Sequence, residues 1–226
     1  MRRNTADVLT ELIPLNGKIV LDIGCGDGAL VRRMTRSGAH VTGLESSPGQ
    51  LQRARNIPPE GDEIYIPGQA QYLPMGDGST DLVVFSNSLH HIPVPDMALA
   101  LGEAARVLRP GGLLFVAEPV AEGPFFQVTR LIDDETEVRA QAYRTLLDQA
   151  PRLGLLEERE EFFTSTVRHP DFAAFKARMT AIDESRAKRV AENEAALSAA
   201  FTAHGIKTDQ GWHFDQRIRV NLFAKS

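Results

Sequence analysis

The chain has 226 residues, of which 42% are hydrophobic and 24% are charged, and its formal net charge at pH 7 is -5. These values are typical of a folded globular protein and exclude a disordered or fibrous class. The negative charge disfavours a nucleic acid as partner, because phosphate backbones are bound by basic surfaces. The longest apolar run, residues 113–117, is too short to cross a bilayer. We therefore expect a single domain over residues 1–226 with no membrane span.

Cysteine content and the first residues bear on the compartment. Cys25 is the only cysteine in the sequence, so no internal disulfide can form. The first residues lack the apolar run of a secretory signal peptide. Both observations favour a cytoplasmic protein.

The first half of the sequence alternates short apolar runs with helical segments. Continuous apolar runs predict strands that are buried on both faces of a sheet. Their alternation with helices predicts a Rossmann-like, doubly wound α/β fold with right-handed crossovers. The expected strands are residues 18–23, 40–44, 63–66, 81–85 and 113–117, and the expected helices are residues 29–37, 48–55 and 95–108.

After Glu118 the pattern changes to two consecutive helical segments within residues 124–149. A boundary between them is expected at Asp134, whose spacing to Glu137 matches a capping box. Residues 119–150 are too apolar to stay in solvent, so they form either a helical lid over the cofactor end of the sheet or a helical flank. Both alternatives remain open from the sequence.

The last part of the chain, residues 151–226, is expected to complete the sheet with further strands and helices. The last strand alternates apolar and polar residues, which predicts an antiparallel strand half exposed at the sheet edge. The whole sheet would then have about seven mostly parallel strands. The expected elements are a strand at 158–167, helices at 171–179 and 183–204, and the last strand at 212–224.

Glycines follow the first expected strand. Gly24, Gly26 and Gly28 stand where the ligand crevice of an open parallel sheet lies, and their backbone can approach a ligand closely. Gly24, Gly26 and Ala29 also satisfy the dinucleotide fingerprint, so the turn alone does not choose a cofactor. Glu45 ends the second strand about 20 residues later, where a carboxylate can accept both ribose hydroxyl hydrogens of an adenosine. A cofactor that contains a nucleoside is therefore expected.

Further motifs follow the glycine turn in a fixed order. They occupy residues 20–28, 41–45, 68–75, 78–84, 89–92 and 106–112. In this order they resemble the class I S-adenosylmethionine-dependent methyltransferases, and above all the type 11 branch that includes ubiquinone and menaquinone methyltransferases. The resemblance covers residues 18–118, the expected cofactor-binding core. It implies S-adenosyl-L-methionine as the cofactor and S-adenosyl-L-homocysteine as the product.

The resemblance implies roles for residues of the first two strands. Asp22 would orient the glycine loop and the amino group of the cofactor. Gly24 and Gly26 would line the methionine moiety, and Glu45 would hold the ribose. Cys25 lies in the same turn and borders the cofactor, where it is expected to pack rather than to react.

The resemblance extends these roles to the adenine and the sulfonium. Ser46 would border the adenosine, and Ala70 would offer its backbone N–H to the adenine ring. Ser86 and Asn87 would lie beside the sulfonium, largely through their backbone. The family usually has an Asp where this chain has Gln69, which can accept a hydrogen bond through its amide oxygen but lacks the charge. The geometry of adenine binding is therefore expected to differ at this position.

Methyl transfer requires alignment and exclusion of water, and it requires a base only when the acceptor must lose a proton. His90 and His91 are the candidate bases, because they follow the fourth strand, where the family places substrate-facing residues. A His at this place also supports the cofactor pocket in the family. Of the two, His91 is favoured as the base. No metal is expected, because adjacent side chains point apart and no further ligands stand at metal spacing.

These features predict an S-adenosylmethionine-dependent methyltransferase that acts on an oxygen, carbon or nitrogen of a small-molecule metabolite. One alternative is a non-catalytic domain that binds the same cofactor as a sensor or partner subunit. Another is a nicotinamide-dependent oxidoreductase, which the motifs between residues 73 and 112 disfavour. A homodimer is compatible with an exposed last strand and a long charged helix.

Overall fold

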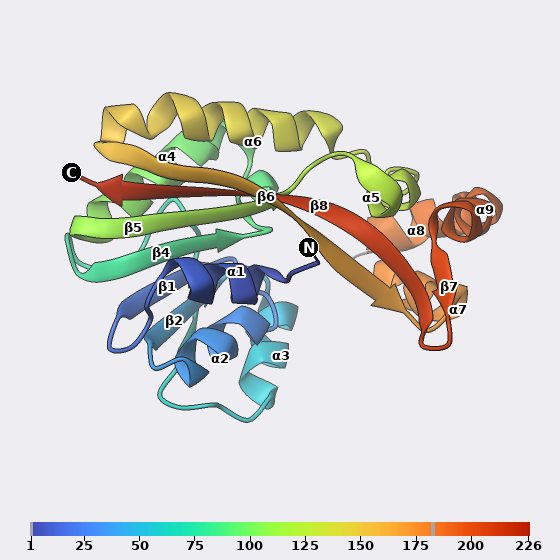
Figure 1. The fold of residues 1–226 in the computed structure, drawn as a ribbon, viewed down its shortest axis with the longest axis horizontal. Helices are drawn as coiled ribbons and strands as arrows, with labels where there is room; N and C mark the ends of the chain where they lie inside the picture. The colour runs from blue at the N-terminus through green and yellow to red at the C-terminus, as the bar shows by residue number, and fades with distance from the viewer. Residues whose placement is uncertain (1, 182–183) are drawn as a thin grey trace. The chain divides into compact units, whose positions relative to one another are not determined.

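The computed structural model describes residues 2–181 and 184–226, and Figure 1 shows their fold. These residues divide into two compact units. The sheet unit comprises Thr5–Glu118, Val138–Phe162 and Arg219–Ser226. The helical unit comprises the described residues within Met1–Asn4, Pro119–Glu137 and Phe163–Ile218. The expectation of a single domain is not tested by this division and stays a prediction.

The sheet has eight strands in the order β3-β2-β1-β4-β5-β8-β6, and β7 pairs with β8. The pairs β1–β2, β1–β4, β2–β3 and β4–β5 are parallel, whereas Figure 1 shows β8 running opposite to β4. The predicted Rossmann-like, mostly parallel sheet with an antiparallel last strand is confirmed. The strands are β1 (Ile19–Ile23), β2 (His40–Glu45), β3 (Ile64–Pro67), β4 (Thr80–Ser86), β5 (Leu108–Pro119), β6 (Leu155–His169), β7 (Ile206–Thr208) and β8 (Gly211–Lys225).

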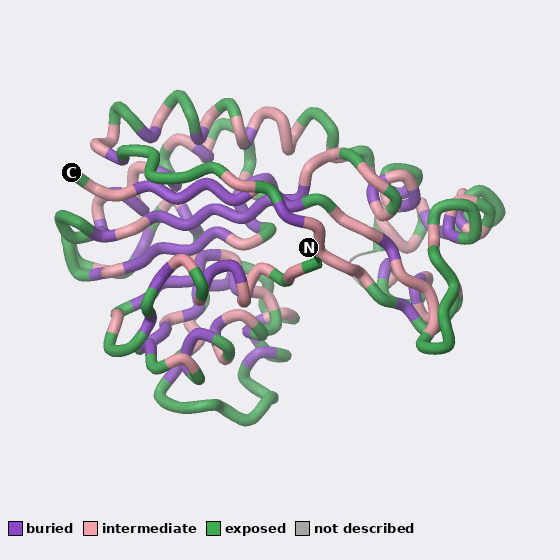
Figure 2. The backbone as a smooth tube through the Cα atoms, viewed as in Figure 1, coloured by how far each residue is buried: buried purple, intermediate pink, exposed green. Residues whose placement is uncertain are grey.

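The central strands of the sheet unit are buried on both faces, as Figure 2 shows along β1, β4 and β5. Successive side chains of a strand point to opposite faces. Leu21 and Val83 face α4 (Val94–Val107) and belong to one apolar cluster with its residues. Val20, on the opposite face of β1, is 1% exposed. Burial on both faces explains why these strands read as continuous apolar runs.

The chain reverses its direction of travel across the sheet at β1. It first runs outward from β1 through β2 to β3, and it then returns to β4 and β5 on the other side of β1. In an open parallel sheet, ligands bind in the crevice at the carboxyl ends of the strands beside such a reversal. The turns that follow β1, β2 and β4 therefore border the expected site.

The helices of the sheet unit follow the expected alternation with two differences. The expected helices correspond to α2 (Ala29–Arg36), α3 (Pro48–Asn56) and α4. The helix α1 (Thr5–Leu12) was not expected, although Val8 and Leu9 bury one of its faces. The 3-10 turn η1 (Leu89–His91) follows β4, and η2 (Pro151–Leu153) precedes β6.

The two helices expected within residues 124–149 are α5 (Gly123–Thr129) and α6 (Thr136–Gln149). Their boundary lies at Asp134 as expected, and the Asp134 carboxylate accepts a hydrogen bond from the backbone N–H of Thr136 at 3.1 Å. Within the sheet unit, Ala142 and Leu146 of α6 join the apolar cluster of the sheet. A lid function of residues 119–150 stays a prediction.

The helical unit has a core of its own, rich in aromatic rings. Its helices are α5, α7 (Phe172–Thr180), α8 (Glu184–Glu192) and α9 (Glu194–His204). The ring centroid of Phe201 lies 4.8 Å from that of Phe214 and 5.3 Å from that of Phe175. The buried core residues are Val128, Ile132, Phe175, Met179, Val190, Leu197, Phe201 and Phe214.

The expectation of one long helix over residues 183–204 is wrong for the described part of this range, since residue 183 lies outside the described residues. The helices α8 and α9 are separated at Asn193. The Asn193 side-chain amide donates a hydrogen bond to the carbonyl of Arg189 at 2.9 Å. The backbone N–H of Asn193 also donates to Arg189 at 3.1 Å, and the break comes where the φ angle of Asn193, −112°, leaves the helical range.

The expectation that the last strand lies at the sheet edge is also wrong. β8 lies between β5 and β6, and β6 forms this edge of the sheet. Asn221, a polar residue in the alternation of β8, is 1% exposed. Its side-chain amide donates to Glu157 at 3.0 Å and to Glu160 at 2.9 Å. These bonds allow the polar side chain of Asn221 to be buried. The alternation of apolar and polar residues in β8 therefore did not indicate a face exposed to solvent.

No helix within residues 2–181 and 184–226 combines the length and the apolar character that crossing a membrane requires.

Candidate functional site

The glycine turn after β1 is held against the end of β2. The backbone N–H groups of Gly24 and Cys25 both donate to the carbonyl of Leu44, at 2.8 Å and 3.1 Å. Gly24 and Gly26 have φ angles of +73° and +58°, in the left-handed region that favours glycine. The turn therefore requires glycine for its conformation alone, whether or not it binds a ligand.

The glycines of this turn differ in what surrounds them. A Cβ at Gly24 would lie 2.6 Å from the Cβ of Ser88, and a Cβ at Gly28 would lie 2.5 Å from the ring of Tyr65. At Gly26 a Cβ would meet nothing within 4 Å. Gly24 and Gly28 are thus needed for close packing, whereas Gly26 leaves open space in which a ligand could contact the backbone.

Asp22 is buried near the carboxyl end of β1 without a full set of partners. The residue is 2% exposed, and its Oδ1 atom has no hydrogen-bond partner among the described residues. Burial, and then the negative charge of Glu45, raise the pKa of the Asp22 carboxyl to about 7. A buried carboxylate oxygen is costly unless it is bonded, so this site lacks a donor, and a cationic donor would suit it best.

Glu45 lies at the end of β2 and is 8% exposed. Its Oε2 atom accepts a hydrogen bond from the backbone N–H of Gly26 at 2.9 Å, and Oε1 accepts one from Ser47 at 2.7 Å. Each carboxylate oxygen has a second lone pair that can accept another donor. The carboxylate thus fixes the glycine turn and keeps capacity for a ligand hydroxyl.

The hydrogen-bond acceptors of this site, the carboxylates of Asp22 and Glu45, fit the cofactor that the sequence implies. S-adenosylmethionine carries an ammonium group, which could supply the missing donor to Asp22. Its ribose carries two hydroxyls, which could donate to Glu45. The open space at Gly26 lies between these two carboxylates along the chain contacts: the turn follows Asp22 in β1, and the Gly26 N–H donates to Glu45. The residues present therefore fit this group.

The residues expected around the adenine lie on the loop after β3 and at the end of β2. Ser46 and Gln69 are exposed, whereas Ala70 is 7% exposed and belongs to the core. The Gln69 carbonyl accepts from the backbone N–H of Tyr72 at 3.1 Å. The Gln69 side-chain oxygen accepts from the amide of Gln71 at 3.4 Å. Gln69 is thus accessible for adenine, and its contact with adenine stays a prediction.

The turn after β4 carries a strained residue. Asn87 has a φ angle of +56°, and among the described residues other than glycine it alone has a positive φ. Its backbone N–H donates to the carbonyl of Ala117 at 2.8 Å. The half-buried Ser86 pairs with Ala117 in the β4–β5 register. Such backbone strain persists only where the surroundings hold it, and it is frequent at ligand sites.

Ser88 was not expected as a site residue, although it links this turn to β1. Its hydroxyl donates to the carbonyl of Ile23 at 2.6 Å, and the residue is 7% exposed. The sequence signal was weak, because a Ser after a strand is equally common in ordinary loops.

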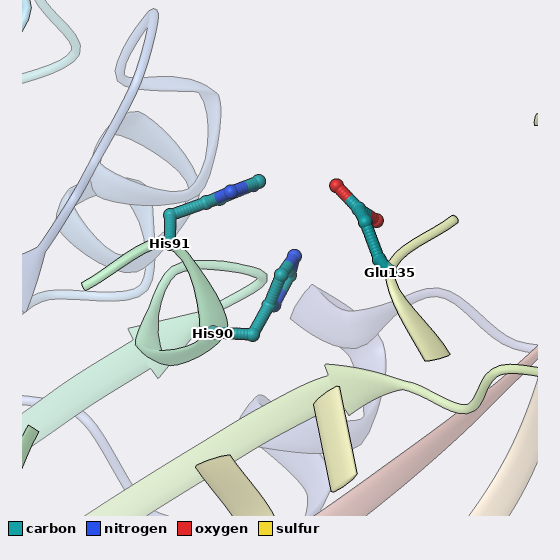
Figure 3. A group of neighbouring side chains, drawn as sticks. All are labelled: His90, His91 and Glu135. Carbon is teal, nitrogen blue, oxygen red and sulfur yellow. The ribbon is translucent and has the colours of Figure 1, made fainter. Parts of the chain in front are cut away.

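The candidate bases His90 and His91 occupy different environments, and Figure 3 shows their rings projecting from η1. His90 is 3% exposed, and its Nδ1 atom bonds to the carboxylate of Glu118. His91 is exposed, and its ring centroid lies 4.0 Å from that of His90. Glu135, which the same figure draws, belongs to the helical unit. The favoured candidate, His91, is thus the more accessible of the two rings, whereas His90 is buried.

Cys25 lies in the interior of the site rather than on its surface. The residue is 9% exposed. Burial, followed by the charges of Asp22 and Glu45, raises the pKa of its thiol well above the usual range. A thiol that stays protonated is a poor nucleophile, which agrees with the expected packing role.

The methyltransferase domain model matches residues 21–116 of this chain. An uncharacterized methyltransferase of Synechocystis is 38% identical over 103 residues, which cover 45% of this chain and 47% of that protein. The 27-O-demethylrifamycin SV methyltransferase of Amycolatopsis mediterranei is 38% identical over 118 residues, which cover 50% of this chain and 43% of that protein. The chain spans about half the length of these curated relatives.

A solved structure of a candidate methyltransferase from Bacillus halodurans has the same fold. It superposes with a TM-score of 0.66 at 20% identity and covers 98% of both chains. The fold, the order of the motifs and the domain match agree with one another. Residues 21–116 thus match the methyltransferase domain family, and the fold is that of the solved methyltransferase structure.

Proposed function

We propose that this chain transfers the methyl group of S-adenosylmethionine to a small-molecule acceptor. The single observation that carries the proposal is the buried Asp22 carboxylate with an unpartnered oxygen. It lies at the carboxyl end of the central strand, in the position that the family uses for its cofactor. The family match of residues 21–116 supports the same cofactor.

Several residues of the sheet unit would hold the cofactor. Asp22 would accept the ammonium group, and Gly26 would allow the methionine moiety to approach the backbone. Glu45 would accept the ribose hydroxyls while it keeps its bonds to the N–H groups of Gly26 and Ser47. The remaining cofactor-binding residues of this proposal are Gly24, Cys25, Ser46, Gln69, Ala70, Ser86 and Asn87.

When bound, S-adenosylmethionine supplies an electrophilic methyl carbon whose bond to sulfur breaks as the acceptor bonds to it, which leaves S-adenosylhomocysteine. The protein has to align the acceptor and exclude water, and it has to remove a proton if the acceptor carries one. His90 and His91 are the residues we propose for that proton. The relative from Amycolatopsis mediterranei is named for methylation at an oxygen, which supports a hydroxyl acceptor.

Calorimetry with S-adenosylmethionine and with S-adenosylhomocysteine tests the cofactor part of the proposal. We expect both to bind, and Asp22→Asn to weaken both. The exposed Asp209→Asn is the matched control, because it removes the same charge from a surface position. Absence of binding by either compound at high micromolar concentration would overturn the proposal.

Transfer of a labelled methyl group tests the catalytic part. We expect label from S-adenosylmethionine to enter the small-molecule fraction of a cell extract when the protein is present. Tight binding of the cofactor with repeated failure of transfer would instead indicate a domain that only senses the cofactor.

A further inference from the structure

The loop between β3 and β4 carries the residues proposed for the adenine. Residues 68–79, all of which the structure describes, form no helix and no strand, and within them Gln69 and Tyr72 form an isolated bridge. The backbone N–H of Tyr72 donates to the carbonyl of Gln69 at 3.1 Å, which closes a turn around Ala70. The side chains of Ala70 and Leu73 are buried in the apolar cluster of the sheet unit. Backbone groups of such a loop need hydrogen-bond partners from another element.

Arg106 on α4 supplies these partners with its whole guanidinium, which has five N–H groups in one plane. Nε donates to Glu103 at 2.6 Å, and Nη2 donates to Glu103 at 2.8 Å and to the carbonyl of Leu73 at 3.0 Å. Nη1 donates to the carbonyl of Met75 at 2.8 Å and to the carboxylate of Asp77 at 2.7 Å. Three of the five bonds therefore go to every second residue of the loop, and the planar fork fixes their directions relative to one another.

Glu103, one helical turn before Arg106, completes this contact. Its Oε2 atom accepts a hydrogen bond from the backbone N–H of Leu73 at 2.8 Å, so both backbone groups of Leu73 are bound by α4. The hydrogen bonds from Arg106 hold the pKa of the Glu103 carboxyl below its usual value, so Glu103 stays an acceptor at neutral pH. The carbonyl of Arg106 accepts from the backbone N–H of Gly78 at 3.0 Å. One turn of α4 thus holds the loop at Leu73, Met75 and Gly78.

The charge of the pair does not account for this arrangement. The side chains of Glu103 and Arg106 are partly exposed and three residues apart on a helix. Ion pairs of that kind stabilise a protein only weakly. The pair instead determines position, because a guanidinium binds several acceptors in a rigid plane, whereas the ammonium of a lysine acts as a point charge on a flexible stem.

We propose that Arg106 and Glu103 are positioning residues that hold the loop after β3 in the shape that recognises the adenine of the cofactor. The proposal rests on the proposed function and deepens it, since Gln69 and Ala70 of this loop are expected to contact the adenine. The turn that begins at Gln69 ends directly before Leu73, whose backbone α4 holds on both sides. The backbone N–H of Ala70 is thereby kept in one direction.

This direction decides which base the loop accepts. A backbone N–H can only donate, whereas the amide of Gln69 can present either its oxygen or its NH2 group. Because Gln69 and Ala70 are adjacent, we expect them to meet adjacent groups of the adenine, its amino group and the ring nitrogen N1. In hypoxanthine N1 carries a hydrogen, which would face the N–H of Ala70. Selectivity for adenine therefore depends on Ala70, and Ala70 depends on the residues of α4.

Calorimetry with S-adenosylhomocysteine and S-inosylhomocysteine tests this dependence. We expect the wild type to bind the adenine compound at least about tenfold more tightly, as for the loss of one hydrogen bond to a donor left unpaired. Arg106→Lys keeps the charge but lacks the fork, and we expect the ratio of the two Kd values to fall below about threefold. Equal binding of both compounds by the wild type would overturn the recognition of adenine by this loop.

Arg36→Lys is the matched control, because Arg36 also pairs with a glutamate and holds a different loop. Its Nε donates to Glu60 at 3.1 Å, before β3. We expect the ratio of Kd values in Arg36→Lys to equal that of the wild type. A general loss of stability would weaken the binding of both compounds by the same factor and leave the ratio unchanged. An unchanged ratio in Arg106→Lys would therefore overturn the positioning role.

Hydrogen exchange of the free protein reads the loop without any ligand. We expect the N–H groups of Leu73 and Gly78 to exchange at least about tenfold faster in Arg106→Lys than in the wild type. Equal exchange in both proteins would show that Arg106 does not hold the loop. Faster exchange without binding of S-adenosylhomocysteine by the wild type would overturn the proposed function, whereas binding with an unchanged ratio in Arg106→Lys would overturn the positioning role alone.

Discussion

Two carboxylates are buried at the carboxyl ends of strands in the sheet unit, and their surroundings differ. Asp22 on β1 is 2% exposed and has an oxygen without a hydrogen-bond partner, and its pKa is raised to about 7. Glu118 on β5 is 4% exposed, and both of its oxygens form hydrogen bonds with the turn after β4. The two carboxylates are thus buried to a similar extent, but only Glu118 has a hydrogen-bond partner for both of its oxygens.

The difference separates a binding group from a structural one. A buried carboxylate whose partners are all in the protein stabilises the fold and orients its donors. A buried carboxylate that lacks a donor lowers the stability of the free protein and increases its affinity for a ligand that supplies one. Asp22 and Glu118 should therefore respond differently to the same substitutions.

The largest expected effect concerns the two proposed bases, of which His90 is buried and His91 is exposed. We expect His90→Asn to lower kcat by about 100-fold to 10,000-fold, the usual contribution of a general base. His91→Asn should lower it by less than about tenfold, because that ring is exposed to solvent. Initial rates with labelled S-adenosylmethionine and an acceptor purified from the extract give both values. Equal losses in the two variants would contradict the distinction.

The next effect is on stability, and its sign differs between the two carboxylates. Glu118→Ala leaves two backbone N–H groups and His90 without their acceptor, so we expect the free energy of unfolding to fall by about 3 kcal/mol. Asp22→Ala removes a carboxyl whose pKa is raised from 3.8 to about 7, so folding is opposed increasingly as the pH rises from about 4 to 7, and the full cost remains at pH 8. We expect it to raise the free energy of unfolding at pH 8 by about 1 kcal/mol. Urea denaturation measures both, and a large loss for Asp22→Ala would contradict the assignment.

Cofactor affinity should depend on Asp22 more than on any surface carboxylate. Asp22→Asn keeps the size of the side chain but removes the charge that an ammonium would pair with. We expect the Kd for S-adenosylhomocysteine to rise by about tenfold to 100-fold, as for the loss of a charged hydrogen bond. Calorimetry measures the change, and the same rise in Asp209→Asn would show that the effect is not local.

The smallest expected effect is the pH dependence of that affinity. Because the pKa of Asp22 is about 7 in the free protein, its carboxyl is mostly protonated below pH 7 and must lose a proton to pair with an ammonium. Binding of S-adenosylhomocysteine should tighten between pH 6 and pH 7.5, by at most about tenfold per pH unit. In Asp22→Asn the Kd should not change over this range. A wild-type Kd that is independent of pH would contradict the raised pKa.

The sequence predicted β1, β2, β4 and β5 because their burial leaves short apolar runs that turn residues bound on either side. It did not predict the position of β8, because a buried Asn221 resembles a solvent-facing residue until its bonds to Glu157 and Glu160 are known. It also did not predict the break at Asn193, where the φ angle of −112° leaves the helical range although the apolar residues Val190 and Leu197 keep a helical spacing across it.

For the candidate site, the sequence predicted which residues are involved but not which hydrogen-bond partners they have. The motif order identified Asp22, Glu45 and His90, since each follows or ends a predicted strand. That Asp22 lacks a donor while His90 has a carboxylate depends on contacts between strands that are distant in the sequence. Glu118 and His90 are 28 residues apart along the chain, and no local pattern reports such a contact.

The close approach of Gly24 to Ser88 has a consequence for how the two turns vary. A Cβ at Gly24 would lie 2.6 Å from that of Ser88, and the Ser88 hydroxyl holds the carbonyl of Ile23 at 2.6 Å. Gly24 therefore cannot gain a side chain unless Ser88 moves, and a move of Ser88 would disturb its bond to Ile23. A substitution in the turn after β1 thus changes the turn after β4 as well.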